Sequence, residues 1–198
     1  MGLLPLWIVI AIIVILALFF WGAYNGLVRL RNEVKNAWAQ IDVQLKRRHD
    51  LIPNLIETVR GYKDFERATL EAVTKARNVA VQASSAGAGV GAQAAAEGEL
   101  SSALARLMVV VERYPDLKAN QNFLALQEEL TSTENKISFS RQFYNDSVLK
   151  YNNQTQMFPS NIVASISSFK ASEFFEVKAP EEREPPKVDF SQPTPPAK

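Results

Sequence analysis

The feature that most constrains this chain is an uncharged, apolar run at its N-terminus. No charged side chain occurs from Leu3 to Trp21. At about 1.5 Å per residue, a helix over this run is about 28 Å long, which matches the hydrocarbon thickness of a bilayer. Trp7 lies near one end of the run, and Trp21 and Tyr24 lie near the other, where their amphipathic rings suit the two headgroup regions. The sequence therefore predicts one membrane-spanning helix that contacts lipid through residues 3–21.

A cleaved signal peptide is the alternative interpretation of this run, and the sequence disfavours it. No Lys or Arg precedes the apolar residues, and the run is long for a signal peptide. No clear small-x-small cleavage site follows, and residues 22–26 lead directly into a helical pattern. We therefore expect a retained anchor over residues 1–23.

The charges that flank the run predict its orientation. Arg29, Arg31 and Lys35 follow the run, with Glu33 among them, and a basic cluster comes at residues 46–48. Because positive charge is retained on the cytoplasmic side of a span, the short N-terminus is expected outside and the rest of the chain in the cytoplasm.

Composition limits the chemistry that the remaining chain can perform. The chain has 198 residues, a net charge of +1, no cysteine and a single histidine, His49. Disulfides and thiolate chemistry are therefore excluded, and a zinc site or a serine-type triad is disfavoured. No Glu-x-x-His pair is present to build a di-iron site, and no basic block indicates a nucleic-acid partner. We expect no catalytic, cofactor-binding or metal-ligating residue, and no enzymatic activity.

Four helical segments are predicted after the anchor, within one domain at residues 24–175. The first covers about residues 24–52, where apolar side chains recur at three- and four-residue steps. Pro53 lacks a backbone donor, so it is expected to end or kink this helix. The other segments are expected at about residues 54–82, 92–113 and 115–156.

Two stretches are predicted to lack regular structure. Residues 83–98 consist mostly of Ala, Gly and Ser, which is typical of a flexible loop. Their three closely spaced glycines do not form a phosphate loop, because no Gly-Lys-Ser/Thr follows. Residues 176–198 are rich in Pro and charge and are expected to be a disordered tail. A PxxP pattern at residues 193–196 has the form that aromatic grooves bind, although a plain tail is the favoured interpretation.

The last predicted helix has the clearest periodicity in the chain. An aromatic or aliphatic residue recurs at every seventh position: Phe123, Leu130, Ile137, Tyr144, Tyr151 and Phe158. The positions three residues further on include Thr133, Ser140 and Ser147, which are small and polar. One interpretation is ordinary core packing with hydroxyls bonded back to the helix backbone. The other is a face that receives a neighbouring helix of this chain or of a partner.

The candidate interaction residues are charged or polar. The densest charge cluster, at residues 46–50, is either a solvated helix face or a contact with anionic lipid or an acidic partner. On a straight helix the cluster would lie roughly 35–40 Å beyond the membrane surface. The candidates are Arg47, Arg48, His49 and Asp50, followed by Tyr114, Asp116, Lys118 and Asn120 in the turn before the last helix.

Several segments together resemble one known family. They are residues 24–32, 37–55, 114–120, 133–135, 144–148 and 158–162. Their sequences resemble the LemA family of bacterial membrane proteins, from the anchor to about Phe175. The resemblance implies one N-terminal span, an antiparallel four-helix bundle, an outside N-terminus and a cytoplasmic bundle. It implies no enzymatic activity, and one branch of the family is similar to magnetosome membrane proteins, which suggests membrane organisation.

We therefore expect an all-α protein in which a transmembrane helix continues into an antiparallel four-helix bundle. The expected function is that of a non-enzymatic scaffold or adaptor at the bacterial inner membrane. Its partners would be further copies of the chain, in a homo-oligomer, or other membrane proteins. The alternative is a protein that organises or remodels membrane lipid. An enzyme would require a pocket with convergent polar groups inside the bundle.

Overall fold

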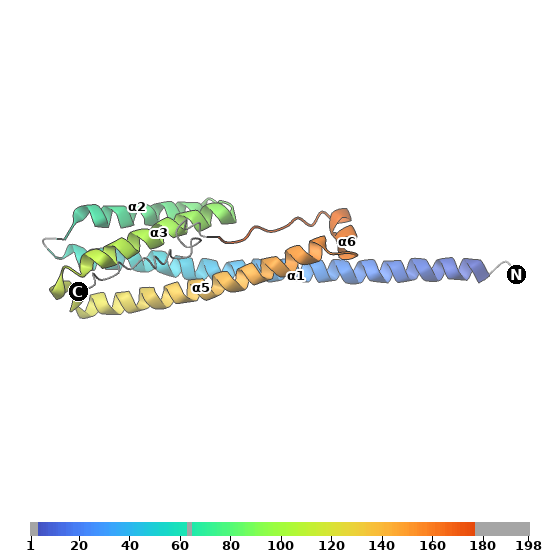
Figure 1. The fold of residues 1–198 in the computed structure, drawn as a ribbon, viewed down its shortest axis with the longest axis horizontal. Coiled ribbons are helices and arrows are strands. Elements are labelled where there is room, and N and C mark those ends of the chain that lie inside the picture. Colours follow the sequence, from blue (N-terminus) through green and yellow to red (C-terminus); the bar gives the residue numbers. More distant parts are fainter. Residues whose placement is uncertain (1–3, 63–64, 177–198) are drawn as a thin grey trace, which may run out of the picture.

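The computed structural model describes residues 4–62 and 65–176, and every regular element in them is a helix. The predicted all-α class is therefore confirmed (Figure 1). The elements are α1 (Leu4–Arg60), α2 (Arg67–Ser85), α3 (Val90–Val111), α4 (Pro115–Lys118), α5 (Gln121–Gln156) and α6 (Ser160–Ile166).

All four long helices lie side by side where α2 and α3 pack beside the C-terminal part of α1 and the N-terminal part of α5 (Figure 1). Successive helices among α1, α2, α3 and α5 run in opposite directions, and α1 packs on α5 as α2 packs on α3 (Figure 1). One hydrophobic core joins the two pairs through side chains such as Leu55, Val73, Leu100 and Leu130, one from each long helix. We call α2, α3, α5 and the part of α1 that packs on them the bundle.

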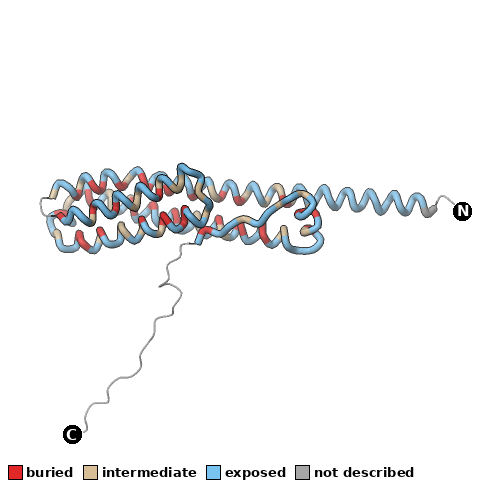
Figure 2. Tube along the Cα trace, turned by 90° about the horizontal axis from the view of Figure 1, so that it is seen from above, coloured by how far each residue is buried: buried red, intermediate tan, exposed pale blue. Residues whose placement is uncertain are grey.

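The N-terminal part of α1 projects from the bundle alone. Residues 6–22 are exposed although nearly all of them are apolar (Figure 2). This part of α1 is long and apolar enough to cross a membrane, and its most apolar window buries nothing inside the protein. The described structure thus leaves bare the segment in which the sequence predicts a span.

Pro53 does not end the first helix, so the expected boundary at residue 52 is wrong. The helix continues through Pro53 to Arg60, and the next helix, α2, begins at Arg67. Pro53 has no N–H to donate to the carbonyl of His49, four residues earlier. The guanidinium Nε of Arg77, on α2, donates to that carbonyl at 2.9 Å instead. A long-range bond therefore satisfies the acceptor that proline leaves free.

The flexible loop expected at residues 83–98 is also wrong in its extent. The helix α2 continues to Ser85 and α3 begins at Val90, which leaves only residues 86–89 as the connection. Gly87 has φ +61° there, a conformation that glycine adopts without strain. Alanine has the highest helix propensity, and the buried Ala94 and Ala96 allow neighbouring helices to approach closely.

The predicted last helix is interrupted near its start. The single turn α4 comes first, and Asn120 then caps α5 by accepting from the backbone N–H groups of Asn122 (2.9 Å) and Phe123 (3.1 Å). Within α5, the buried hydroxyls of Thr133 and Ser147 donate to carbonyls four residues earlier, each at 2.8 Å. The core-packing interpretation is confirmed for these two positions.

Residues 167–176, which we call the strap, run back along α5 after α6. The amide of Asn152 donates to the carbonyl of Ser172 (2.9 Å) and accepts from the Ser172 N–H (2.8 Å). Asn145 makes the same pair of bonds with Phe175, at 3.2 and 2.9 Å. The strap is thus held by side chains that replace the partners of a β-ladder. The tail predicted to be disordered lies, from residue 177, outside the described residues.

The bond between Arg77 and His49 predicts a coupling between Arg77 and Pro53. Replacing Arg77 with Met should lower the free energy of unfolding of the full chain in detergent by about 1–3 kcal/mol, because a buried carbonyl loses its donor. In a Pro53→Ala background the residue-53 N–H restores that donor, so Arg77→Met should cost less. Urea unfolding followed by circular dichroism measures all four variants. If Arg77→Met lowered the free energy of unfolding equally in both backgrounds, Arg77 would not be the donor that replaces the missing N–H of Pro53.

Candidate functional site

A buried guanidinium lies at the centre of the bundle. Arg48, on α1, is only 1% exposed. It donates to the hydroxyl of Ser101 (2.9 Å) on α3 and to the carboxylate of Glu134 (2.5 Å) on α5. Its other terminal nitrogen pairs with the carboxylate of Glu97 on α3. We call Arg48, His49, Glu97, Ser101 and Glu134 the Arg48 cluster.

Glu97 is the buried anion of the cluster. One carboxylate oxygen pairs with Arg48, and the other accepts from Nε2 of His49 at 2.9 Å. Burial raises the pKa of Glu97, but the bond from His49 and the positive charge of Arg48 outweigh burial. The pKa of Glu97 therefore lies below the ordinary value for glutamate. The carboxylate is ionised wherever the bundle is folded near neutral pH.

The geometry of this cluster suits cross-linking of helices better than chemistry. A general base needs a free oxygen, access to substrate and a pKa near the working pH. Both oxygens of Glu97 are engaged by neighbours, its side chain is 3% exposed, and its lowered pKa makes it a weak base. Three helices are instead joined by charge-assisted hydrogen bonds.

Three consecutive residues of α1 reach all the other long helices. Successive side chains on a helix point about 100° apart, so neighbours in sequence contact different elements. Arg47 pairs with Glu129 on α5, Arg48 bonds α3 and α5, and His49 bonds α3. The backbone carbonyl of His49 adds the bond to Arg77 of α2. This stretch of α1 therefore bonds α2, α3 and α5 and limits their movement relative to α1.

The candidate interaction surface at residues 47–50 is divided by the fold. Arg48 and His49 are buried among other helices, so neither is accessible to an external partner. Arg47 and Asp50 are exposed, and their role in binding stays a prediction.

The second group of candidates lies in the turn around α4. Asp116 and Lys118 are exposed, and Lys118 pairs with Glu112 at 2.5 Å. Asn120 caps α5 and also donates to the hydroxyl of Tyr62 at 3.1 Å. The ring of Tyr114 packs on that of Phe65 with centroids 5.1 Å apart. Asn120 and Tyr114 thus stabilise the turn, and an interaction role for the turn stays a prediction.

Sequence reasoning missed the partners of Arg48. Glu97 falls in the Ala- and Gly-rich stretch that was expected to be a loop, and Ser101 and Glu134 were not paired with any cation. One signal was available: Glu97, Leu100, Leu104 and Leu107 share helical spacing, which places Glu97 on the apolar face of α3. Within residues 4–62 and 65–176, no three His, Cys, Asp or Glu residues are grouped so as to hold a metal ion.

Removal of Arg48 should destabilise the bundle far more than removal of its neighbour. Arg48→Met leaves the Glu97 carboxylate buried beside His49 alone and should lower the free energy of unfolding by about 3–5 kcal/mol. Arg47→Met breaks only the half-exposed pair with Glu129 and should cost less than about 1 kcal/mol. Urea unfolding of the full chain in detergent measures both.

A double variant separates a broken ion pair from lost packing. Because Arg48→Met with Glu97→Leu removes both buried charges, it should be more stable than Arg48→Met alone. If the loss of stability in the double variant, relative to the native chain, equalled the sum of the losses in Arg48→Met and Glu97→Leu, the buried charges would not be coupled.

The lowered pKa of Glu97 predicts the direction of one pH effect. A carboxyl group whose pKa is lower in the folded state contributes stability that is complete above the unfolded pKa, about 4.3, and is lost as pH falls through the folded pKa. The difference in free energy of unfolding between the native chain and Glu97→Gln should therefore be constant just above the unfolded pKa of about 4.3 and should shrink as the pH falls below it. Thermal melts between about pH 5 and pH 3, below the titration range of an ordinary histidine, measure it. A difference that grows on acidification would show that the folded pKa is raised.

Comparison with known proteins identifies relatives over most of the chain. A model of the LemA family matches residues 37–190. Protein LemA of Metamycoplasma hominis is 30% identical over 162 residues, which cover 77% of this chain and 71% of that protein. Magnetosome protein MamQ 2 of Paramagnetospirillum magneticum is 26% identical over 177 residues, which cover 78% of this chain and 65% of that protein. The chain thus matches just under two thirds of the length of the magnetosome relative.

Proposed function

The chain belongs to the LemA family, and from this premise we propose that it is a non-enzymatic, membrane-anchored scaffold or adaptor. Its anchor is the projecting part of α1, and its binding surface for protein is on the bundle. The partners are further copies of this chain or other proteins of the same membrane. The relatives named for the magnetosome support a role at a membrane.

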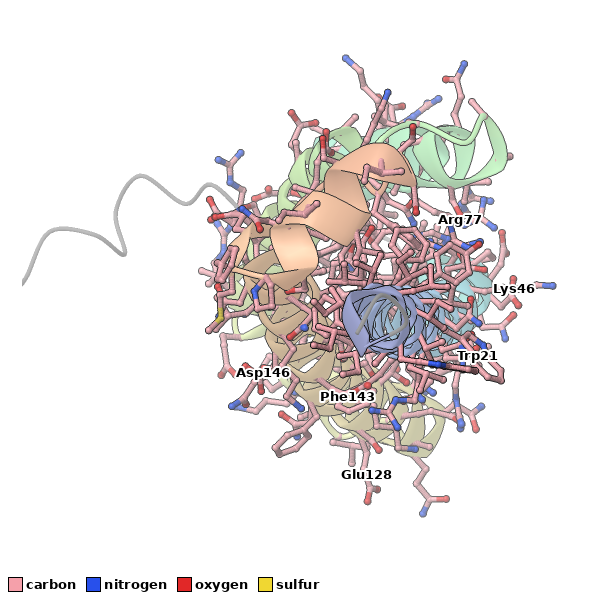
Figure 3. All side chains as sticks on the ribbon, turned by 90° about the vertical axis from the view of Figure 1, so that its right-hand side faces the viewer. Trp21, Lys46, Arg77, Glu128, Phe143 and Asp146 are labelled. Atoms are coloured by element: carbon pink, nitrogen blue, oxygen red, sulfur yellow. The ribbon has the colours of Figure 1, made fainter. Side chains whose placement is uncertain are left out.

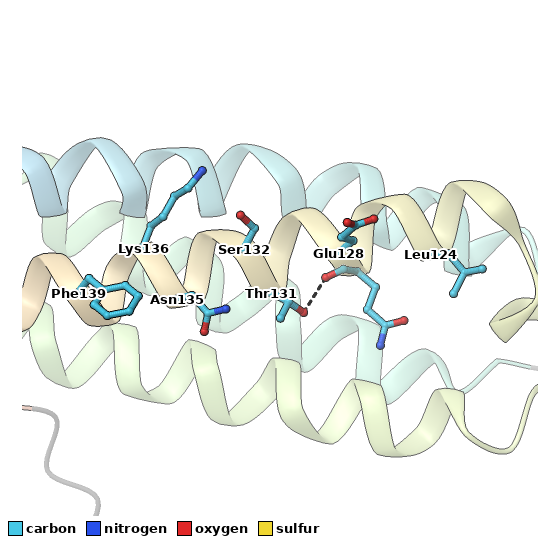
Figure 4. Close-up of a pocket in the computed structure, with 8 residues that line it drawn as sticks. Leu124, Glu128, Thr131, Ser132, Asn135, Lys136 and Phe139 are labelled. Carbon is cyan, nitrogen blue, oxygen red and sulfur yellow. Dashed lines mark hydrogen bonds between the residues drawn. The ribbon is translucent and has the colours of Figure 1, made fainter.

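The observation that carries this proposal is the outward face of α5. Phe139 is 73% exposed there, Leu124 is 46% exposed, and polar side chains such as Thr131 lie between them (Figure 4). Phe143 is 42% exposed about one helical turn beyond Phe139, towards the membrane-proximal end, and it lies with Glu128 on the side of the bundle away from Arg77 (Figure 3). Large exposed apolar side chains rimmed by polar ones are typical of protein contact surfaces.

Membrane anchoring makes a weak contact at this face effective. Copies held in one membrane share one orientation, so the same α5 residues of two copies lie at the same height. A two-fold contact about the membrane normal would pair the α5 face with itself. Confinement to one surface also raises the effective concentration of any membrane-bound partner.

The membrane and its orientation are part of the proposal. We place the chain in the bacterial inner membrane with the N-terminus outside and the bundle in the cytoplasm, because the charges that follow the apolar run are mainly basic. Protease added to intact spheroplasts should leave the bundle uncut. Digestion of the bundle before lysis would show that the bundle lies outside the membrane, which is the opposite orientation.

Photo-crosslinking tests the outward face of α5. A benzoylphenylalanine at position 139, introduced into the full chain in intact cells, should give one discrete adduct on irradiation, because this side chain would lie in a protein contact. An adduct with the mass of two chains identifies self-association, and any other discrete adduct identifies a partner. Gel mobility and mass spectrometry of the purified adduct measure the outcome.

Val109 supplies the matched control for this experiment. It is 70% exposed and apolar like Phe139, but it lies on α3. The same probe at position 109 should give no discrete adduct. Equal yields of adduct at both positions, or no adduct at position 139, would show that the outward face of α5 is not a protein contact surface. The scaffold proposal would then be refuted.

A second candidate function is the organisation of membrane lipid, and one observation favours it. Every charged side chain in residues 1–32 and 147–172 is a cation. These ranges include the end of the bundle nearest to the projecting part of α1, where α6 and the end of α5 lie (Figure 1). A purely basic end suits contact with anionic phospholipid.

A further inference from the structure

The turn between α5 and α6 lies beside the end of the apolar part of α1. Met157, Phe158 and Pro159 line a shallow cleft together with Leu18, Phe19 and Gly22 of α1. One turn further along α1, Leu27 packs against Val163 and Ala164 of α6. The ring of Phe169 contacts that of Tyr24, with centroids 5.6 Å apart. The position of α6 relative to α1 is therefore fixed by packing.

This part of the chain exposes large apolar side chains. Met157 is 61% exposed, Phe158 79%, Ile162 51% and Ile166 68%. The opposite face of α6, with Val163 and Ala164, is buried against α1. The exposed side chains are continuous with the bare apolar surface of α1 through the cleft. We call Met157, Phe158, Ile162 and Ile166 the collar.

The height of the collar along α1 coincides with the expected edge of the hydrocarbon. A core about 30 Å thick takes up about 20 residues of an α-helix. If the core begins at Leu4, the first residue of α1, it ends near Tyr24. The cleft places Met157 and Phe158 level with Leu18–Gly22, which is within that length. The turn thus reaches the depth at which Trp21 and Tyr24 mark the interface.

Four cations lie just behind the collar. Arg29 and Arg31 are on α1, Lys150 is on α5 and Lys170 is on the strap, and all four are exposed. No acidic residue occurs in residues 1–32 or 147–172. Glu33 is the nearest acidic partner of Lys150, at 4.0 Å. The guanidinium of Arg31 lies over the Phe169 ring, 5.1 Å from its centroid, so it is held beside the strap.

We propose that this end of the bundle is a second membrane contact that binds anionic phospholipid. The collar enters the interface of the bilayer that α1 spans, and Arg29, Arg31, Lys150 and Lys170 contact phosphate groups of the same leaflet. Apolar side chains that enter the interface next to basic residues are the pattern of an interfacial helix. The proposal rests on the membrane anchoring proposed above and does not depend on the α5 face.

Site-directed spin labelling tests the depth of the collar. The chain has no cysteine, so a single cysteine can be introduced and labelled at any position. In the full chain reconstituted into vesicles of phosphatidylcholine and phosphatidylglycerol, a label at Phe158→Cys should be more accessible to oxygen than to a nickel chelate, several-fold more so than a label in water. A water-like ratio at position 158 would overturn the proposal.

Two reference labels distinguish this failure from a failure of anchoring. Ile12→Cys reports the apolar part of α1, and Val109→Cys reports a position on α3 that is 70% exposed, against 79% for Phe158. The expected order of the oxygen preference is position 12, then 158, then 109. A lipid-like signal at position 12 with equal, water-like signals at 158 and 109 would support the membrane anchor and refute the contact of the collar with the bilayer. A water-like signal at position 12 would refute the anchor itself.

Lipid selectivity tests the four cations. Spin-labelled phosphatidylglycerol should be restricted by the protein several-fold more strongly than spin-labelled phosphatidylcholine, and the preference should fall as salt is added. Lys150→Gln with Lys170→Gln should reduce the preference. Lys75→Gln with Lys136→Gln removes the same charge from exposed positions on α2 and mid-α5 and should leave it unchanged. Equal effects of the two pairs, or no preference in the native chain, would overturn binding of anionic headgroups by this end.

Discussion

One buried ion pair, between Arg48 and Glu97, links the helices of the bundle. The guanidinium of Arg48 is surrounded by helices and bonds Glu97, Ser101 and Glu134 from two of them. Apolar side chains tolerate small sliding of one helix along another, but an ion pair with fixed bonding directions does not. The cluster therefore sets the register of α1, α3 and α5. It has a cost, because Nε of Arg48 is buried without an acceptor among the described residues.

The same stretch of α1 explains how a proline is accommodated in its interior. The carbonyl of His49 is freed by Pro53 and is bonded by Arg77. The imidazole of the same residue bonds Glu97. One residue thus connects α1 to α2 through its backbone and to α3 through its side chain. The apparent defect in the helix is a cross-link between helices.

The sequence predicted those features that depend on local pattern. The apolar run, the stripe of α1 and the heptad of α5 follow from periodicity, and the all-α class follows from them. The boundary at Pro53 and the loop at residues 83–98 were predicted wrongly, because their outcome depends on partners far away in sequence. Arg77 is 24 positions after Pro53, and Arg48 is 49 positions before Glu97. The same reason hid the Arg48 cluster, since an isolated sequence does not show which carboxylate faces a basic residue.

The heptad period of α5 places side chains in the core of the bundle and also matches the spacing of the strap. A heptad advances about 10.5 Å along a helix, and three residues of extended chain advance about 10 Å. Asn145 and Asn152 are one heptad apart, and their partners Phe175 and Ser172 are three residues apart. Tyr144 and Tyr151 repeat this match on the carbonyls of Glu173 and Lys170, at 2.9 Å each.

This match ties the basic, collar-bearing end of the chain to the rest of the bundle. The strap begins directly after α6, so each bond that fixes the strap on α5 also limits movement of α6 relative to α1. The aromatic contacts of Phe175 with Trp38 and of Phe169 with Tyr24 fix the two ends of the strap on α1. A surface that is to lie at a constant depth in a bilayer must be rigid relative to the helix that spans it. The paired asparagines and tyrosines of α5 supply that rigidity, and they place the collar where the apolar part of α1 ends.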